Sequence, residues 1–194
     1  MDIETPHGPA RAHLHTAADA RAALVLGHGA AGSVTSADLV AATEAALAQR
    51  VTVALVEQPY LVAGRKSAAP APQLDTAWKA VIEQLPLDGL PLIAGGRSSG
   101  ARVACRTAAD TNATAVLCLA FPVHPPGKPE KSRLSELDAV TVPVLVVQGT
   151  SDPFGMPPGA SGREVVTVPG NHSLARSRDA VAAAVGDWLD RMLD

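Results

Sequence analysis

The sequence contains only two cysteines, Cys105 and Cys118, among its 194 residues. Two cysteines are too few for a disulfide framework or for a zinc cluster. Cysteine is also among the residue types most often found buried. We therefore interpret both as buried thiols of a protein that works in a reducing compartment, and the expected location is the cytoplasm.

Features that direct a chain to nucleic acid or to a membrane are also missing. The formal net charge is −3, so neither nucleic acid nor an anionic membrane surface is expected as a partner. The first residues lack the basic region and the apolar core of a signal peptide. The apolar run around Cys118 is interrupted by Pro122 and is far too short to span a bilayer.

What the sequence does contain is an alternation of apolar runs and helical stretches. Hydrophobic residues make up 47% of the chain and charged residues 18%, which predicts one globular domain over residues 1–194. An opening hairpin with its turn at residues 7–9 is followed by apolar runs at 22–27, 51–58, 90–96, 113–122, 142–149 and 163–170. Helical stretches occupy residues 36–50, 73–85, 99–111 and 177–193. This order is typical of a mostly parallel α/β sheet with helices on both faces.

One strand end carries the segment Gly96-Arg97-Ser98-Ser99-Gly100, and ligands of open α/β sheets bind beyond such ends. The segment fits the pattern G-x-S-x-G, in which the serine occupies a cramped turn between a strand and a helix. The helix amides then point at the place where negative charge develops. Ser98 is therefore the predicted nucleophile, and the Ser99 amide is a predicted oxyanion donor.

An acid and a base follow the serine at the ends of later strands. Asp152 lies 54 residues after Ser98, and His172 lies 20 residues after Asp152. Serine, acid and histidine in this order are the chain order of α/β hydrolases. His172 would take the proton of Ser98, and Asp152 would orient the imidazole ring. The alternatives are that Asp152 only forms a turn and that His172 is an ordinary surface histidine.

The loop of residues 27–32 offers a competing interpretation. It matches the dinucleotide pattern G-x-G-x-x-G, and Glu57 ends the next apolar run where a ribose-binding acid would lie. In a dinucleotide fold the last glycine lies inside the opening helix. Here the helix is expected to begin only after Thr35 or Ser36, so a dinucleotide-binding oxidoreductase is the less favoured hypothesis. On the hydrolase interpretation the Ala30 amide is the second oxyanion donor.

Other polar residues near the strand ends are candidate substrate contacts. The basic ones are Arg65, Lys66, Arg97, Lys128 and Lys131, and the histidines are His28 and His124. The basic residues predict a positive field that attracts an anionic small-molecule ester. The alternatives are solvated side chains, arginines that bond loop carbonyls, a structural ring at position 28 and a loop anchor at position 124. No metal or cofactor is expected, and His13 and His15 are interpreted as a solvated strand face.

With these residues the sequence resembles the small, cap-less α/β hydrolases of the dienelactone-hydrolase-like type. It is most similar to the branch that contains the testis-expressed and NSL-complex hydrolase-like proteins. The matching segments cover most of the chain: "LVLGHGAAG", "VEQPYLVAGRKSAAPAP", "PLIAGGRSSGARVA", "AFPVHPPGKPEK", "VPVLVVQGTSDPFG" and "PGNHSL".

The resemblance implies an α/β-hydrolase fold with an N-terminal hairpin and no cap domain. It also implies a carboxylesterase-like serine hydrolase with Ser98, Asp152 and His172 as its triad. No long insertion follows residues 113–122, where many α/β hydrolases place a cap, so small or exposed acyl groups are the expected substrates. Because some members of the family act as complex subunits, a catalytically silent binding or scaffold protein is the alternative function.

Overall fold

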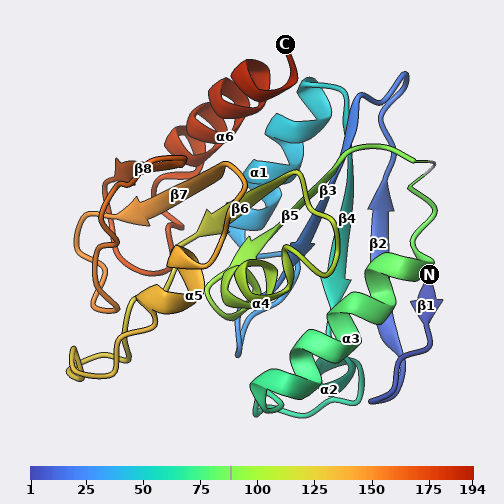
Figure 1. Cartoon of the computed structure of the whole chain (residues 1–194), viewed down its shortest axis with the longest axis horizontal. Helices are drawn as coiled ribbons and strands as arrows, with labels where there is room; N and C mark the ends of the chain where they lie inside the picture. The colour runs from blue at the N-terminus through green and yellow to red at the C-terminus, as the bar shows by residue number, and fades with distance from the viewer. Residues whose placement is uncertain (88) are drawn as a thin grey trace.

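The computed structural model describes residues 1–87 and 89–194, and within them the strands form one eight-stranded sheet (Figure 1). The sheet order is β1-β2-β4-β3-β5-β6-β7-β8. The strands are β1 (Asp2–Ile3), β2 (Ala10–His15), β3 (Ala22–Gly27), β4 (Val51–Glu57), β5 (Leu92–Arg97), β6 (Ala115–Leu119), β7 (Val144–Gly149) and β8 (Arg163–Val168).

In sheet order the strands from β4 to β8 are parallel, and helices cover both faces of this part of the sheet. Strand β3 pairs in parallel with β4 on one side and with β5 on the other. Every residue of β3, β6 and β7 is buried, which explains why their sequences are continuous apolar runs rather than alternating ones. The mostly parallel α/β sheet predicted from these runs is confirmed.

The N-terminal hairpin forms the antiparallel edge of the sheet. Strand β1 pairs antiparallel with β2, and β2 pairs antiparallel with β4. Gly8, in the connecting turn, has a φ of +99°, a conformation that side chains rarely adopt. Ala10 and Ala12 face the core whereas Arg11 and His13 face solvent, so the start of β2 alternates as a half-exposed strand does.

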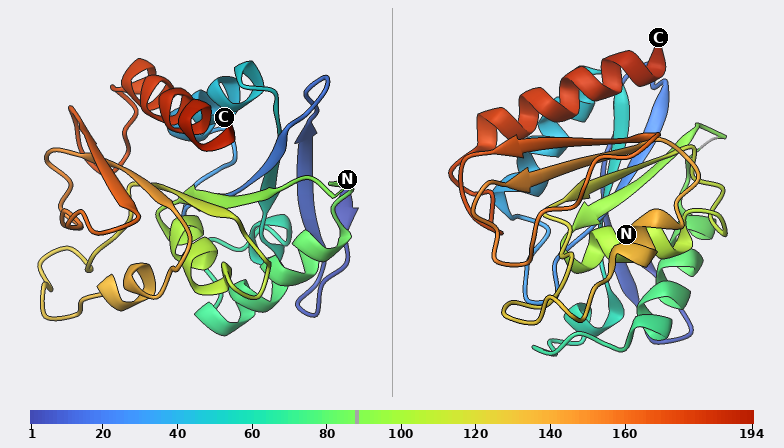
Figure 2. Two further views of the ribbon diagram at one scale, coloured as in Figure 1. Left: turned by 45° about the horizontal axis from the view of Figure 1, so that its top comes forward. Right: turned by 60° about the vertical axis from the view of Figure 1, so that its left-hand side comes forward.

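The helices form two layers, one on each face of the sheet (Figure 2). One layer contains α1 (Ala37–Ala48) and α6 (Arg178–Leu193), which pack on each other. The other layer contains α2 (Pro59–Val62), α3 (Ala71–Gln84), α4 (Ser99–Thr107) and α5 (Leu134–Asp138). Trp78 is fully buried on the α3 side and Trp188 is 4% exposed on the α6 side, so each layer has its own tryptophan-containing core.

The helix boundaries differ from the predicted ones in a few places. Helix α4 ends at Thr107 and not at residue 111, and α3 begins at Ala71 and not at residue 73. The short helices α2 and α5 were not predicted, because segments of four and five residues are too short to show a helical period. Helix α1 begins at Ala37, after the glycines of the first loop, as expected.

The two cysteines are buried free thiols, as predicted. Cys105 lies on α4 and Cys118 on β6, and their Sγ atoms are 3.5 Å apart. The neighbouring Cys105 thiol and burial both raise the pKa of Cys118 well above its usual value. Cys118 is therefore a packing residue and not a reactive thiolate.

Helices long and apolar enough to cross a membrane do not occur among residues 1–87 and 89–194.

Candidate active site

Ser98 occupies the turn between β5 and α4, in a backbone conformation that few residues tolerate. Its φ is 52° and its ψ is −107°. The Ser98 amide donates a hydrogen bond to the carbonyl of Leu119 at 2.9 Å, which ties the turn to the end of β6. Such conformations cost about 1–3 kcal/mol and persist only where the surroundings enforce them.

The glycines that flank Ser98 are required by close approach of main chains. A Cβ on Gly96 would lie 2.5 Å from the carbonyl oxygen of Gly27, and a Cβ on Gly100 would clash with the same oxygen. Any side chain at either position would force β3 and α4 apart. The G-x-S-x-G spacing therefore has a direct physical cause in this fold, namely that strand and helix cross in contact.

The structure brings Ser98, His172 and Asp152 together, although they come from three different loops. The Nδ1 atom of His172 lies 2.8 Å from Oδ2 of Asp152, and its Nε2 atom lies 2.9 Å from Oγ of Ser98. A carboxylate only accepts hydrogen bonds, so Nδ1–H is the donor to Asp152. In the neutral ring Nε2 then accepts from the Ser98 hydroxyl, the arrangement in which a histidine can take the serine proton.

The Asp152 side chain is completely buried and has donors on both of its oxygens. The amide of Phe154 donates to Oδ1 at 2.8 Å. The side-chain amide of Gln148, at the end of β7, donates to Oδ2 at 2.9 Å and also reaches the carbonyl of Gly155. These donors stabilise an ionised carboxylate in a buried place and fix its direction toward His172.

The His172 ring is held from its face as well as from its edge. The ring of Phe154 stacks on it at a centroid distance of 3.9 Å and an interplanar angle of 25°. Rotation of the imidazole out of line with Asp152 would break this stacking. The aromatic contact and the Asp152 hydrogen bond therefore select the same ring orientation.

Arg97 points inward, toward buried partners. Its Nη2 atom donates to the carbonyl of His172 at 3.0 Å. Its Nε atom lies 2.9 Å from Oδ2 of Asp38 on α1, an ion-pair contact whose N–H is not aligned as a hydrogen bond. Because the Asp38 side chain is fully buried, Arg97 supplies the charge that this carboxylate needs. This placement agrees with the alternative in which Arg97 bonds a loop carbonyl, and it differs from a substrate contact.

The two amides predicted as oxyanion donors lie at the first loop and at the start of α4. Ala30 is exposed in the loop that follows β3, and its carbonyl accepts a hydrogen bond from the Tyr60 hydroxyl at 2.9 Å. Within the described residues, neither the Ala30 amide nor the Ser99 amide donates a hydrogen bond to protein. Both donors are thus available to a bound group.

His28 lies beneath this loop, 3% exposed, with both ring nitrogens bonded to main chain. Its Nδ1–H donates to the carbonyl of Gly29 at 2.7 Å, and its Nε2 accepts from the amide of Gln58 at 3.0 Å. Burial lowers the pKa of His28 and favours the neutral ring that these two bonds require. The ring has no nitrogen left for substrate, which agrees with a structural role.

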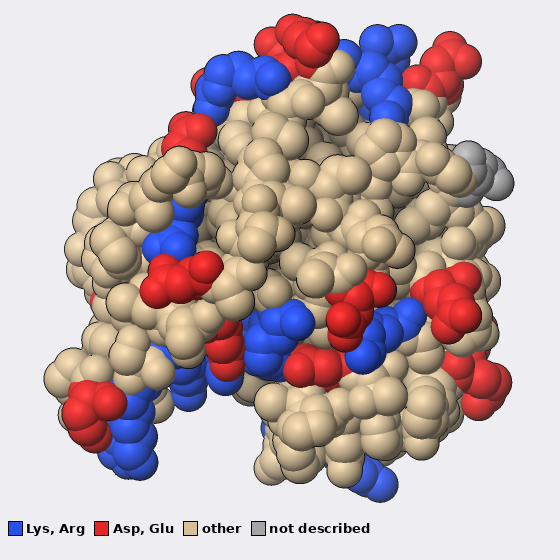
Figure 3. All heavy atoms as spheres, in the orientation of Figure 1, with Lys and Arg blue, Asp and Glu red and all other residues tan. Residues whose placement is uncertain are grey.

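The remaining candidate contacts are His124 and the basic residues after α2. His124 bonds the carbonyl of Pro125 at 2.9 Å, and a Cβ on Gly155 would lie 2.8 Å from its Nε2, so it supports the loop that carries Asp152. Arg65 and Lys66 are exposed after α2. On the face shown in Figure 3, basic and acidic side chains lie next to one another instead of forming a basic patch.

Sequence reasoning missed four side chains that hold the site: Gln148, Phe154, Asp38 and Tyr60. Gln148 left the clearest signal, because it is the single polar residue of an otherwise apolar strand, four positions before Asp152. Phe154, Asp38 and Tyr60 gave none, since their contacts join segments far apart in the chain.

The comparison with solved structures agrees with this fold. A serine hydrolase without a lid from Xanthomonas campestris is 20% identical, with a TM-score of 0.75 over 97% of this chain and 93% of that chain. Est1E from Butyrivibrio proteoclasticus, solved with ferulic acid bound, is 20% identical, with a TM-score of 0.78 over 98% of both chains. Dienelactone hydrolase from Anabaena variabilis is 16% identical, with a TM-score of 0.74 over 98% of this chain and 95% of that chain.

The comparison with families rests on the sequence and covers most of the chain. The profile of the family described as "Alpha/beta hydrolase domain" matches residues 20–180. This range runs from just before β3 to the first turn of α6, and it includes Ser98, Asp152 and His172. The fold has no separate cap domain among the described residues, as the lidless relative also has none. The chain belongs to the alpha/beta hydrolase domain family.

Proposed function

We propose that the chain is a serine hydrolase of carboxylic esters or thioesters, acting through Ser98, His172 and Asp152. The observation that carries the proposal is the continuous line of hydrogen bonds at 2.9 Å and 2.8 Å from the serine to the buried acid. The strained turn at Ser98, which presents the hydroxyl at a strand end, supports the same role.

In the first half of the reaction, Oγ of Ser98 attacks the carbonyl carbon of the ester while Nε2 of His172 takes the hydroxyl proton. The carbonyl oxygen becomes an oxyanion that accepts hydrogen bonds from the Ser99 and Ala30 amides. Collapse of this intermediate breaks the bond to the leaving group, which receives the proton from His172. The products are an acyl-serine and a free alcohol or thiol.

In the second half, water attacks the acyl-serine while His172 takes one of its protons. A second tetrahedral intermediate forms on the same two amides. Its collapse releases the carboxylic acid and returns the proton to Ser98. Asp152 stays ionised throughout and stabilises the imidazolium that forms in each half.

The substrates that suit this site have small or exposed acyl groups. The described residues 120–133, which follow β6, contain neither helix nor strand, and residues 126–132 among them are exposed, so this segment forms no helical cap. Within the family, the segment "AFPVHPPGKPEK" supports placement in the branch with the testis-expressed and NSL-complex hydrolase-like proteins.

A fluorophosphonate probe and a short-chain aryl ester test the proposal. We expect the protein to be labelled, and Ser98→Ala to abolish labelling and lower ester turnover at least about 10³-fold. The matched control is Ser67→Ala, which removes an exposed hydroxyl and leaves labelling intact. A correctly folded wild-type protein that neither labels nor hydrolyses any ester of a series would contradict the proposal and favour the silent scaffold.

A further inference from the structure

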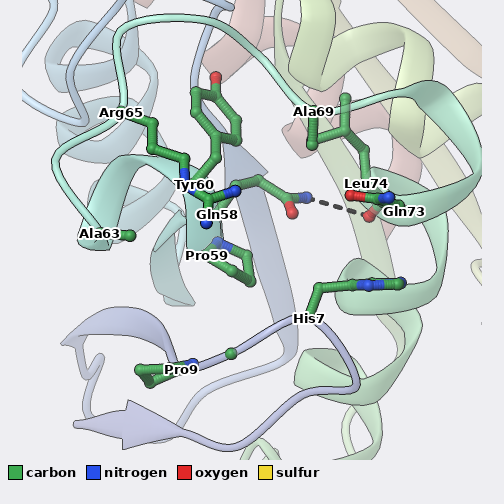
Figure 4. A pocket seen from close by; sticks show the side chains of 11 residues that line it. His7, Pro9, Gln58, Pro59, Tyr60, Ala63, Arg65, Ala69, Gln73 and Leu74 are labelled. Carbon is green, nitrogen blue, oxygen red and sulfur yellow. Dashed lines mark hydrogen bonds between the residues drawn. The ribbon is translucent and has the colours of Figure 1, made fainter.

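A cavity of about 220 Å³ lies beside the predicted active site, between the β1–β2 turn, helix α2 and the start of α3 (Figure 4). Its floor is buried and its rim is exposed. The floor residues are Gln58, Pro59, Tyr60 and Leu74, and the main rim residues are His7, Arg65 and Gln73. Neither Ser98, His172 nor Asp152 lines it.

The lining carries one positive side chain and no acid. Arg65 forms no ion pair with any residue of the described chain, unlike the arginines of α4. Its backbone is nevertheless fixed, because the Arg65 amide bonds the carbonyl of Tyr60 and the Gly64 amide bonds that of Leu61. Gly64, at a φ of +70°, completes this Schellman end of α2. Arg65 is thus an anchored cation at the mouth of a cavity.

The rest of the lining limits the size and polarity of a ligand. The volume corresponds to about seven liquid water molecules, at roughly 30 Å³ each. Pro9, Pro59 and Leu74 supply apolar walls. The side-chain NH2 of Gln58 is bonded to the carbonyl of Leu74 at 3.2 Å, and its Oε1 has no hydrogen-bond partner among the described residues. A ligand for this space has an anionic head and a short apolar body.

We propose that this cavity binds small monocarboxylates. The carboxylate pairs with the planar guanidinium of Arg65, which offers parallel N–H donors at the spacing of two carboxylate oxygens. The short carbon chain lies against Pro59 and Leu74 and leaves water. Neither the established family nor the proposed hydrolysis requires such a site.

The cavity is separate from the proposed oxyanion site but connected to it by one side chain. Tyr60 forms part of the floor, and its hydroxyl donates to the carbonyl of Ala30. Burial raises the pKa of Tyr60 to about 12, so the hydroxyl keeps its proton over the whole physiological range. A ligand in the cavity therefore contacts Tyr60, the residue whose hydroxyl supports the Ala30 loop.

Titration of ¹⁵N-labelled protein with butyrate, followed by amide chemical shifts, tests the site without reference to activity. We expect saturable shifts at Gly64, Arg65 and Gln73 with a dissociation constant of about 1 mM. Butyramide, the neutral isostere, and inorganic phosphate, which lacks the apolar chain, should bind at least about tenfold more weakly. Arg65→Gln should weaken butyrate binding by a similar factor, whereas Arg191→Gln on α6 makes the same charge change and should not.

Several outcomes overturn the proposal. Shifts confined to the amides around Ser98 and His172 would place butyrate in the proposed active site instead. Equal binding of butyrate and butyramide, or unchanged binding in folded Arg65→Gln protein, would remove the role of the guanidinium. None of these titrations depends on turnover, so they test carboxylate binding in the cavity even if the protein has no hydrolase activity.

Discussion

Arg97 donates a hydrogen bond to the main-chain carbonyl of His172 at 3.0 Å, although the two residues are 75 positions apart in the chain. The same guanidinium contacts Asp38 on α1, and its Nη1 lies where a Cβ on Gly29 would be only 2.7 Å away. The Arg97 side chain therefore lies against the loop of the proposed base, the loop after β3, and helix α1, which belongs to the layer opposite α4.

We expect Arg97→Gln to act as the loss of a positioning residue. The carbonyl of His172 loses its donor, so kcat should fall about tenfold or more while KM for a neutral ester changes little. Asp38 also loses its counter-charge, which should lower the free energy of unfolding by about 3 kcal/mol. Steady-state kinetics and urea unfolding measure the two effects.

The double variant Asp38→Asn/Arg97→Gln separates these effects. It removes the unpaired buried charge, so stability should recover in part while kcat stays low. Recovery of both quantities together would mean that Arg97 acts only through stability. Arg178→Gln, an exposed arginine paired with Glu44 on the surface, is the control for the loss of one charge.

Gln148→Leu should reduce turnover without preventing folding. Leucine has a similar volume but cannot donate to Oδ2 of Asp152, so the buried carboxylate keeps only Phe154 and His172 as donors. The lost hydrogen bond to a charged group predicts a decrease in kcat of about 10- to 100-fold. Wild-type kcat in a folded Gln148→Leu protein would show that Asp152 does not need this donor.

Tyr60 is the single tyrosine of the chain, so its ionisation is visible by ultraviolet absorbance alone. In the folded protein the 295 nm absorbance should rise with a midpoint near the pKa of about 12, and in concentrated urea near 10. The folded-state pKa is the higher one, so the unfolded chain loses its proton first and stability falls as pH rises from 10 toward 12. A common midpoint in both states would contradict the burial of this hydroxyl.

His28 predicts a loss of stability on the acid side. Burial lowers its pKa below the ordinary value of 6.5, so the unfolded state binds the proton first as the pH falls. Its contribution to stability is therefore complete above about pH 7 and is lost progressively below pH 6.5. Urea unfolding of His28→Gln should show a lower stability at pH 7 and a smaller decrease between pH 7 and pH 5. His15→Gln, on the exposed end of β2, is the control for the loss of one imidazole.

The parts of the fold that were predictable from the sequence are those set by local pattern. The predicted strand at residues 22–27 has the same bounds as β3, because a strand buried on both faces has an uninterrupted apolar sequence. The order of strands in the sheet and the layer to which each helix belongs were not predictable, since pairing partners are chosen by contacts between distant segments. Helix α4 ends at Thr107, and the turn that follows closes at Asn112, whose φ is 52° and whose amide bonds the carbonyl of Ala109.

For the candidate site, the serine turn was predictable because close packing forces glycines onto fixed positions around Ser98. The acid and the base were predicted from chain order and from their positions at the ends of later strands. The stacking of Phe154 on His172 and the reach of Arg97 to Asp38 were beyond any local pattern, because each depends on how two loops approach one another. Arg97 also shows why a charged residue beside a nucleophile is ambiguous in a sequence: its direction is decided by a carboxylate on α1.

The contact between Gly27 and Gly100 makes the end of β3 and the start of α4 a single rigid frame. The Ala30 loop follows β3 on one side of this frame, and Ser99 begins α4 on the other side. Main-chain packing therefore sets the separation of the Ala30 and Ser99 amides. The exposed segment of residues 126–132 lies outside this frame. A homologous protein can therefore carry a longer segment at this place and bind different substrates, while the positions of the two amides stay the same.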